Sequence, residues 1–143
     1  MQDCIFCKIV TGEVPSSLVY ADANLVAFLD IAPIAPGHTL VVTRGHYPTV
    51  FELPGSLAEE MLWAMQQVGQ AVMQAVRAEG LNLLMNNHRS AGQLIPHAHW
   101  HLIPRKAGDG LLSWEQGEYE SQEAMQRLAQ EISELIPGHG NRD

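Results

Sequence analysis

The stretch that decides the fold runs from Gly92 to Arg105 and reads G-Q-L-I-P-H-A-H-W-H-L-I-P-R. His97, His99 and His101 occupy every second position in it, and apolar residues stand between them. Alternation with a period of two predicts a half-buried β-strand. Side chains at such positions share one face of the strand and follow one another at roughly 6.5–7 Å. We therefore expect three imidazoles along one side of a strand whose other side packs inward.

A row of three histidines on one strand face indicates a function, because solvated faces normally carry Thr, Lys, Glu and Ser. Two chemistries use such a row: a metal site, or imidazoles that act on a phosphoryl group as nucleophile, acid and charge clamp. A catalytic zinc bound by the whole row is the weaker interpretation. His97 and His101 would lie roughly 13 Å apart on a strand, whereas zinc–nitrogen bonds measure about 2.0–2.1 Å. At most one adjacent pair could share a metal.

The rest of the chain predicts an α+β fold with an antiparallel sheet, a long central helix and a C-terminal helix. Further strands are expected at residues 18–20, 25–29, 38–43 and 81–85. The central helix is expected to start at a capping box, Ser56-Leu-Ala-Glu59, and to run to about Glu79 with Gly80 as its stop. The second helix is expected at about 118–136. We expect one domain over 1–143, with a core to about 110 and the C-terminal helix and polar tail over 111–143.

Charge and hydropathy narrow the classes of partner. The formal net charge of −8 argues against sequence-independent binding of nucleic acid, which requires a basic face. It is compatible with a small anionic substrate, because backbone amides and imidazoles set the local field in a pocket. No apolar run is long enough to span a bilayer, and the N-terminus does not resemble a secretory signal. We expect a cytoplasmic protein without a membrane partner.

Two cysteines, Cys4 and Cys7, form a C-x-x-C pair near the N-terminus. A structural disulfide is not expected in a reducing compartment, and a redox pair would follow a strand in a βαβ unit. Half of a metal site is the better interpretation, if two further ligands lie elsewhere in the chain. Two free thiols on a frayed terminus remain the alternative.

These motifs together resemble the histidine-triad (HIT) family of nucleotide hydrolases and transferases. H-A-H-W-H-L-I resembles the signature of the family. Further similarity lies in C-I-F-C-K-I-V-T-G-E-V-P, in A-F-L-D-I-A-P-I-A-P-G-H-T-L-V-V and in A-G-Q before the triad. The resemblance covers nearly the whole chain in the expected order, and it points to bacterial members near the nucleoside phosphoramidate hydrolases, which carry an N-terminal C-x-x-C.

The resemblance implies a role for each matching residue. His99 would be the nucleophile that attacks the α-phosphorus, and His101 and His38 would hold phosphate oxygens. Asn86 would lie near the scissile phosphate, where the hydrolases of dinucleoside triphosphates have glutamine. The family pattern also implies a purine nucleotide site, in which Asp30 binds the ribose hydroxyls and the other members bind the base, the ribose or the phosphate: Ile5, Phe6, Ile9, Phe28, Leu29, Asp30, Gly92 and Gln93.

Zinc-containing relatives in the family also imply a structural zinc bound by Cys4, Cys7, His46 and His97. A C-x-x-C pair supplies half of a tetrahedral site. Phosphate chemistry is assigned to His38, His99 and His101, and His88 and His139 lie in a loop and in the polar tail, so His46 and His97 remain as the other two ligands. The alternative for His46 is a turn cap before Pro48, which the sequence alone favours equally. No catalytic metal is expected, because no carboxylate pair for Mg²⁺ surrounds the triad.

Three functions stay open at this point. The first is hydrolysis of purine nucleoside phosphoramidates through a nucleotidyl-histidine intermediate. The second is hydrolysis of dinucleoside polyphosphates, and the third is nucleotide binding with weak catalysis. Two departures from the phosphoramidate hydrolases bear on the choice: Leu94 stands where serine is common, and His88 where glycine is common. The family also implies a homodimer.

Overall fold

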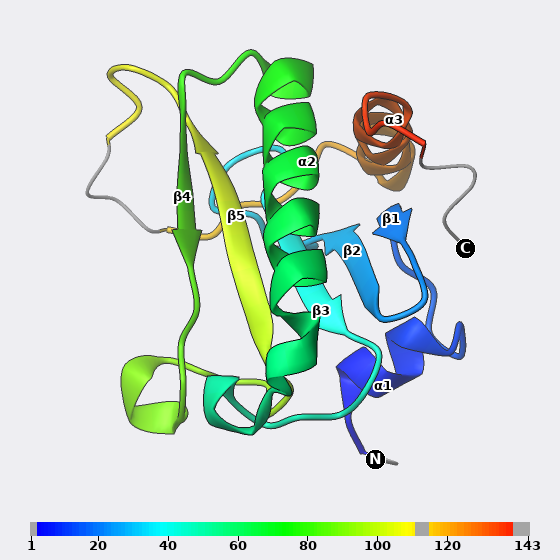
Figure 1. The fold of residues 1–143 in the computed structure, drawn as a ribbon. Coiled ribbons are helices and arrows are strands. Elements are labelled where there is room, and N and C mark those ends of the chain that lie inside the picture. The colour runs from blue at the N-terminus through cyan, green and yellow to red at the C-terminus, as the bar shows by residue number, and fades with distance from the viewer. Residues whose placement is uncertain (1–2, 111–114, 139–143) are drawn as a thin grey trace.

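The structure is a computed structural model, and it describes residues 3–110 and 115–138. Its elements follow the order α1 Ile5–Val10, β1 Leu18–Ala21, β2 Leu25–Leu29, β3 Thr39–Thr43, α2 Ala58–Val76, β4 Gly80–Leu84, β5 His99–Arg105 and α3 Gln122–Glu134. Short 3-10 helices lie at Val50–Glu52, Gly55–Leu57 and Arg89–Ala91. The five strands form one sheet in the order β1-β2-β3-β5-β4, and every neighbouring pair is antiparallel (Figure 1). The predicted α+β class is confirmed.

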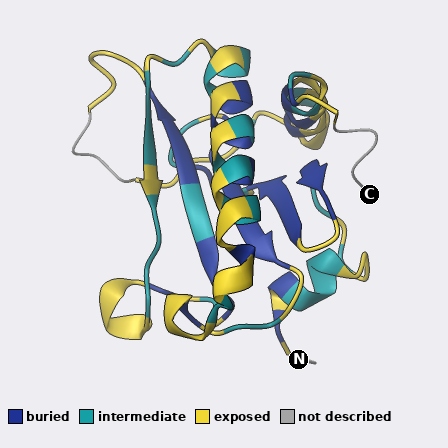
Figure 2. Ribbon diagram, in the orientation of Figure 1, coloured by how far each residue is buried: buried dark blue, intermediate teal, exposed yellow. Residues whose placement is uncertain are grey.

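The sheet separates two apolar clusters because successive side chains of a strand point to opposite faces. On one face Ala27, Leu29, Val41 and Leu102 pack against α2 and α3. On the other face Val26, Phe28, Leu40 and Val42 pack against Phe6 of α1. Figure 2 shows the burial that results, with β2 and β3 wholly buried and α2 buried only along the side that faces the sheet. The face opposite α2 is the one that carries His101, since His101 pairs with Leu40.

The central helix differs from the prediction at both ends. No Ser56–Glu59 capping box forms; the helix follows a 3-10 turn, and the capping box of this region lies at Thr49 and Glu52 instead. The helix ends at Val76, before the predicted stop. Arg77 takes the left-handed conformation with φ 58°, and Gly80 is already the first residue of β4. The backbone N–H of Glu79 donates to the Arg105 carbonyl of β5 at 3.0 Å, so the chain already pairs with the sheet three residues after the end of the helix.

The C-terminal helix is shorter than predicted and begins at a cap. Ser121 accepts a hydrogen bond from the backbone N–H of Ala124 at 3.0 Å, and the helix follows from Gln122 to Glu134. The predicted polar tail beyond residue 138 and residues 111–114 lie outside the described residues. Within the described ranges, no helix combines the length and the apolar character needed to cross a membrane.

Candidate functional site

Strand register builds the site as a row of side chains across the open face of the sheet. His101 of β5 pairs with Leu40 of β3 on one side and with Leu84 of β4 on the other, and Leu40 pairs with Phe28 of β2. Directly opposed residues of neighbouring strands point to the same face. Phe28, Leu40, His101 and Leu84 therefore form one row, with the imidazole flanked by apolar side chains.

His99 lies beside His101 on this face with a defined tautomer. The two ring centroids are 5.1 Å apart, and His99 is 6% exposed. Nδ1 of His99 lies 2.7 Å from the backbone oxygen of His97, and because a carbonyl only accepts, Nδ1 carries the proton. Nε2 of a neutral His99 is then left with its lone pair. A neutral imidazole nitrogen with a free lone pair is a nucleophile near pH 7.

A chain of hydrogen bonds fixes the tautomers of His38 and His101 in the same way. The backbone N–H of Ile34 donates to Nδ1 of His38 at 3.0 Å, so the proton of a neutral His38 is on Nε2. Nε2 of His38 lies 2.9 Å from Nδ1 of His101, which must accept. His101 consequently carries its own proton on Nε2. The Pro- and Gly-rich loop before β3 thus determines which nitrogen of His101 is a donor.

Burial keeps these imidazoles neutral at pH 7. Desolvation, with a smaller effect of neighbouring His99, lowers the pKa of His38 and of His101 to about 4. Desolvation also lowers the pKa of His99, although its hydrogen bond to the His97 carbonyl opposes the shift. The nucleophilic nitrogen of His99 therefore stays unprotonated at neutral pH, and His101 offers a neutral N–H donor rather than a positive charge.

Asp30 completes the polar part of the face. One carboxylate oxygen accepts from the backbone N–H of Ala32 at 2.9 Å, and the other lies 3.7 Å from Nε2 of His38. Burial raises the pKa of this carboxyl group. Asp30, His38 and His101 lie close enough to suggest a metal site. The hydrogen bonds argue against it, because Nε2 of His38 already carries the proton that a metal would have to displace.

A cavity of about 290 Å³ opens beside these polar groups, and it holds the residues that the sequence assigned to the base and ribose. Its lining consists of Ile5, Phe6, Ile9, Val14, Pro15, Ser16, Ser17, Phe28, Leu29, Asp30, Ile31, Leu40, Gln122 and Met125. The Phe6 ring stands edge-on to the rings of His99 at 4.9 Å and Phe28 at 5.5 Å. Sequence reasoning missed the walls contributed by residues 14–17 and by α3.

Asn86, Gly92 and Gln93 are the remaining residues that the sequence assigned to the nucleotide site. Asn86 lines a second cavity together with His101, and a Cβ on Gly92 would approach the Asn86 side-chain nitrogen to 3.4 Å, with Gly92 at φ +99°. Gln93 is buried, and its amide is engaged with backbone: Oε1 accepts from His88 N–H at 2.7 Å, and Nε2 donates to the Pro48 carbonyl at 2.6 Å. Gln93 therefore fixes the loop around Gly92.

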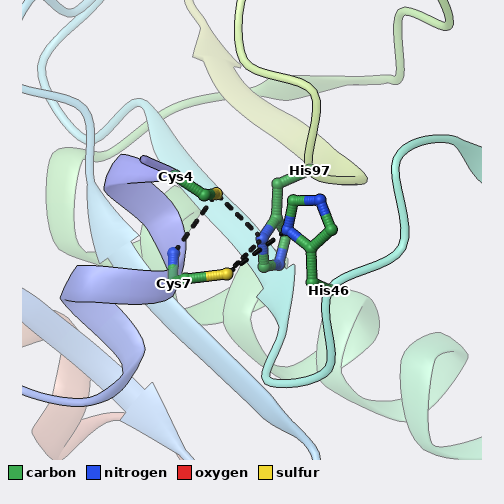
Figure 3. A group of neighbouring side chains, drawn as sticks. All are labelled: Cys4, Cys7, His46 and His97. Carbon is green, nitrogen blue, oxygen red and sulfur yellow. Dashed lines mark hydrogen bonds between the residues drawn. The ribbon is translucent and has the colours of Figure 1, made fainter. Parts of the chain in front are cut away.

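His97 leaves the row that the alternating pattern predicts. Strand β5 begins only at His99, and the His97 ring points to the two cysteines of the N-terminal segment (Figure 3). Nδ1 of His97 lies 3.4 Å from Sγ of Cys4 and 3.6 Å from Sγ of Cys7, and Nδ1 of His46 lies 3.3 Å from Sγ of Cys7. The ligand atoms of all four residues lie within 4.8 Å of one another, an arrangement that could hold a metal ion.

The surroundings of this cluster suit metal binding. Nε2 of His97 lies 2.7 Å from the Thr43 carbonyl and therefore carries the proton, which leaves the Nδ1 lone pair facing the sulfur atoms. The two cysteines form no disulfide with each other. Burial raises the pKa of Cys4, so a metal would have to displace the proton of this thiol. A six-residue helix, α1, carries Cys7, and Cys4 is its N-cap. This helix is too short to show an amphipathic period, so the sequence did not predict it.

The chain belongs to the HIT family, because the family's model, the HIT domain, matches residues 11–108. It is 41% identical over 109 residues to the adenylylsulfatase HINT3 of Arabidopsis thaliana, a match that covers 76% of this chain and 55% of that protein. It is 37% identical over 134 residues to the adenosine 5'-monophosphoramidase hnt1 of Schizosaccharomyces pombe, covering 93% of this chain and 98% of that protein. The predicted family is confirmed.

Solved structures of the family share the fold. A zinc-bound histidine triad protein from Mycobacterium smegmatis superposes with a TM-score of 0.82 at 32% identity, over 94% of this chain and 96% of that one. The predicted HIT-like fold is therefore confirmed.

Proposed function

We propose that this HIT-family hydrolase cleaves purine nucleoside phosphoramidates at the α-phosphate through a nucleotidyl-histidine intermediate. The observation that carries the proposal is the pair of fixed tautomers. His99 has a free Nε2 lone pair, and the neighbouring His101 has an N–H donor on its own Nε2. A nucleophile and a donor side by side, next to an apolar cavity with one carboxylate, suit attack on a nucleotide phosphorus.

The two neutral imidazoles of His99 and His101 have different roles in this proposal. Nε2 of His99 attacks the α-phosphorus, and the P–N bond of the substrate breaks as the amine leaves with the bonding pair and takes a proton from water. Nε2–H of His101, held in that tautomer by His38, donates to a phosphoryl oxygen. Asn86 and the backbone at Gly92 and Gln93 bind the phosphate side. Ile5, Phe6, Ile9, Phe28 and Leu29 enclose the base, and Asp30 accepts from the ribose hydroxyls. Water then hydrolyses the labile nucleotidyl-imidazole, which divides one difficult displacement into two easier steps.

The preference for phosphoramidates over other AMP derivatives rests on Asn86 and on the name of the S. pombe relative. Hydrolysis of dinucleoside polyphosphates is the alternative, and the Arabidopsis relative, named for an adenylyl sulfate, suggests a third leaving group. All three substrates share the AMP half and differ only beyond the phosphorus. We expect kcat/KM for an AMP-amine to exceed that for diadenosine tri- or tetraphosphate; a tenfold excess in the opposite direction would refute the ranking.

We propose zinc as the ion of the cluster at Cys4, Cys7, His46 and His97, with a structural role. Tetrahedral coordination with Zn–S bonds of about 2.3 Å and Zn–N bonds of about 2.0–2.1 Å separates sulfur from nitrogen by about 3.5 Å. The three S–N distances of 3.3, 3.4 and 3.6 Å fit this value. Four protein ligands leave no open position for substrate, so zinc would fasten the N-terminal segment to the start of β5.

Metal analysis tests the zinc proposal. Protein purified without chelator should contain about one zinc per chain, and Cys4→Ser should lose it. A metal-free preparation whose melting temperature stays unchanged on addition of zinc would contradict the proposal.

We further propose that the protein is a cytoplasmic homodimer with one domain per chain, which follows from family membership. Sedimentation would test the homodimer.

Replacement of His99 tests the proposed chemistry. His99→Ala should abolish turnover of an AMP-amine while AMP binding changes by less than about tenfold, since binding rests mainly on the apolar cavity. Trapping with substrate should yield an acid-labile phosphoramidate on His99. His88→Ala is the matched control, because His88 is exposed on the loop before the triad and should leave the adduct in place. An adduct on another residue, or full activity of His99→Ala, would refute the assignment.

A further inference from the structure

A short segment before α3, residues 117–120, lies against the loop that precedes β3, and we call this segment the strap. Two hydrogen bonds join the strap to the loop. The backbone N–H of Gly117 donates to the Pro33 carbonyl at 2.7 Å, and the hydroxyl oxygen of Tyr119 accepts from the backbone N–H of Gly37 at 2.9 Å. Figure 1 shows the strap in orange beside the light-blue loop. The strap lies beyond residue 108, where the match to the HIT domain ends.

The strap has an anchor of its own, so its position does not depend on the loop alone. Tyr119 is half-buried, and its side chain packs against the apolar cluster between the sheet and helices α2 and α3. Two residues later, Ser121 caps the N-terminus of α3, whose buried side belongs to the same cluster. The packing of α3 therefore determines where the strap lies.

The two hydrogen bonds hold the loop on both sides of Ile34. Pro33 directly precedes Ile34, and Gly37 follows it three residues later. The backbone N–H of Ile34 donates to Nδ1 of His38 at 3.0 Å, and Nε2 of His38 lies 2.9 Å from Nδ1 of His101. A continuous chain of contacts therefore leads from the strap, through one backbone N–H, to the tautomer of His101.

Release of the loop would move the proton on both imidazoles. If the N–H of Ile34 moves away, Nδ1 of His38 loses its donor and is free to carry the proton itself. Nε2 of His38 then has a lone pair, so Nδ1 of His101 donates to it. Nε2 of His101 would be left as an acceptor, which cannot donate to a phosphoryl oxygen. The strap is therefore connected to the donor of the proposed reaction.

We propose that the strap is a positioning element of the catalytic face, in which Gly117 and Tyr119 hold Ile34 against His38 and thereby keep the proton of His101 on Nε2. The catalytic part of this inference rests on the proposed phosphoramidate hydrolysis, whereas the effect on the tautomer does not. Neither Gly117 nor Tyr119 is among the described residues that line the nucleoside cavity or the cavity beside Asn86. The two residues therefore act through the loop.

The test uses Tyr119→Phe and Gly117→Pro, alone and together. Phenylalanine keeps the ring in the apolar cluster and removes the accepting oxygen, and proline removes the donating N–H. Nitrogen NMR of histidine-labelled protein near neutral pH shows which ring nitrogen of His101 carries the proton. Loss of one hydrogen bond changes an equilibrium by about fivefold. The ratio of the Nδ1–H to the Nε2–H tautomer should therefore rise by up to about fivefold in each single variant and up to about 25-fold in the double variant.

Turnover of an AMP-amine is the second measurement. Because only the Nε2–H tautomer of His101 donates to the phosphoryl oxygen, kcat of the double variant should fall by about threefold or more. The dissociation constant of AMP should change by less than about threefold, since the residues that line the nucleoside cavity are unaltered. A fall in kcat without a change in the tautomer ratio would show a merely structural role and would overturn the inference.

Two matched controls lie in the strap itself. Glu118→Gln replaces an exposed side chain between Gly117 and Tyr119 and should keep both the wild-type tautomer ratio and kcat. Gly117→Ala retains the N–H, and the added Cβ would lie 3.5 Å from the Pro33 oxygen, which is an ordinary contact. Gly117→Ala should therefore retain the tautomer that Gly117→Pro loses.

The outcomes separate this inference from the proposed function. An unchanged tautomer ratio in the double variant, in a protein whose melting temperature is lower, would overturn the inference and leave the proposed hydrolysis standing. If no AMP-amine yields AMP or an adduct on His99, the proposed function fails and the catalytic part of the inference fails with it. Tyr119→Phe provides the test by itself if the proline variant does not fold.

Discussion

Removal of the metal should weaken nucleotide binding, because one short helix serves both sites. Helix α1 carries Cys7 of the cluster proposed to bind zinc, and its residues Ile5, Phe6 and Ile9 line the 290 Å³ cavity in which we place the nucleoside. A six-residue helix is not stable alone in water. Its position depends on the metal cluster at its N-terminal end and on the burial of Phe6. Without the metal, we expect α1 to separate from the cavity for part of the time.

The size of the effect follows from the surface that the base would lose. If the wall formed by α1 covers about 60–80 Å² of the base, its loss costs about 1.5–2 kcal/mol at about 25 cal/mol per Å². The dissociation constant of AMP should then rise about 10- to 30-fold in the metal-free protein. Coupling between two binding equilibria is reciprocal, so saturating AMP should tighten metal binding by the same factor.

Two titrations check this linkage. Calorimetry gives the AMP dissociation constant with and without zinc, and competition with a chelator gives the zinc dissociation constant with and without AMP. Cys7→Ser should reproduce the metal-free AMP affinity. Lys8→Ser, on the same helix but outside the metal cluster and the cavity lining, should leave it unchanged. A change in AMP affinity below about threefold, in a metal-free protein whose melting temperature is lower, would refute the coupling. A disagreement between the factor by which zinc changes the AMP dissociation constant and the factor by which AMP changes the zinc dissociation constant would also refute it.

Three further predictions concern the stability of the catalytic face. His38 has a pKa of about 4 against an ordinary 6.5, so between these pH values the unfolded chain binds a proton that the folded chain does not. The free energy of unfolding should therefore fall as the pH drops from 6.5 to 4. Urea denaturation of His38→Asn should show a fall that is smaller by roughly 3 kcal/mol. Tyr119→Phe removes the hydroxyl that accepts from Gly37 N–H at 2.9 Å and should cost about 1–2 kcal/mol; an unchanged urea midpoint would contradict it. Gln93→Ala leaves buried backbone groups without partners and should cost about 2–3 kcal/mol in the same assay, whereas Gln93→Glu should retain the acceptor for His88 N–H.

Most of the sheet could be predicted because its strands carry regular signals. Residues 25–29 and 39–43 are continuous runs of apolar and β-branched side chains between turn residues, and the structure has strands there with nearly the predicted bounds. The ends of α2 could not be predicted in the same way. The C-terminal end depends on Arg105, a residue far along the chain, whose carbonyl accepts the N–H of Glu79, so the signal at Gly80 yielded to pairing between distant segments. At the N-terminal end a 3-10 turn, Gly55–Leu57, precedes the helix in place of the predicted Ser56 cap.

The candidate site was predictable in its residue types and unpredictable in its tautomers. A sequence can show that histidines alternate, but the proton position on His38 depends on the backbone N–H of Ile34, which reaches Nδ1 only because the loop between them turns back. The contribution of Gln122 and Met125 to the nucleoside cavity was missed for a similar reason. Both lie on α3, more than twenty residues after the triad, and no local pattern links that helix to the open face.

His97, the first histidine of the triad, belongs to the metal cluster through its ring and also fixes the tautomer of His99, the second histidine, through its backbone oxygen. Its ring presents Nδ1 to the two sulfur atoms and donates through Nε2 to the Thr43 carbonyl, so both nitrogens are engaged. Its backbone oxygen meanwhile accepts from Nδ1 of His99 and so leaves the lone pair on Nε2 of His99. Because ring and carbonyl belong to one residue, a metal that holds the His97 ring also limits the movement of that carbonyl. A metal bound at this cluster would therefore act on two parts of the proposed reaction by separate routes: it would hold α1 against the cavity proposed for the base, and it would maintain the tautomer of His99 through His97.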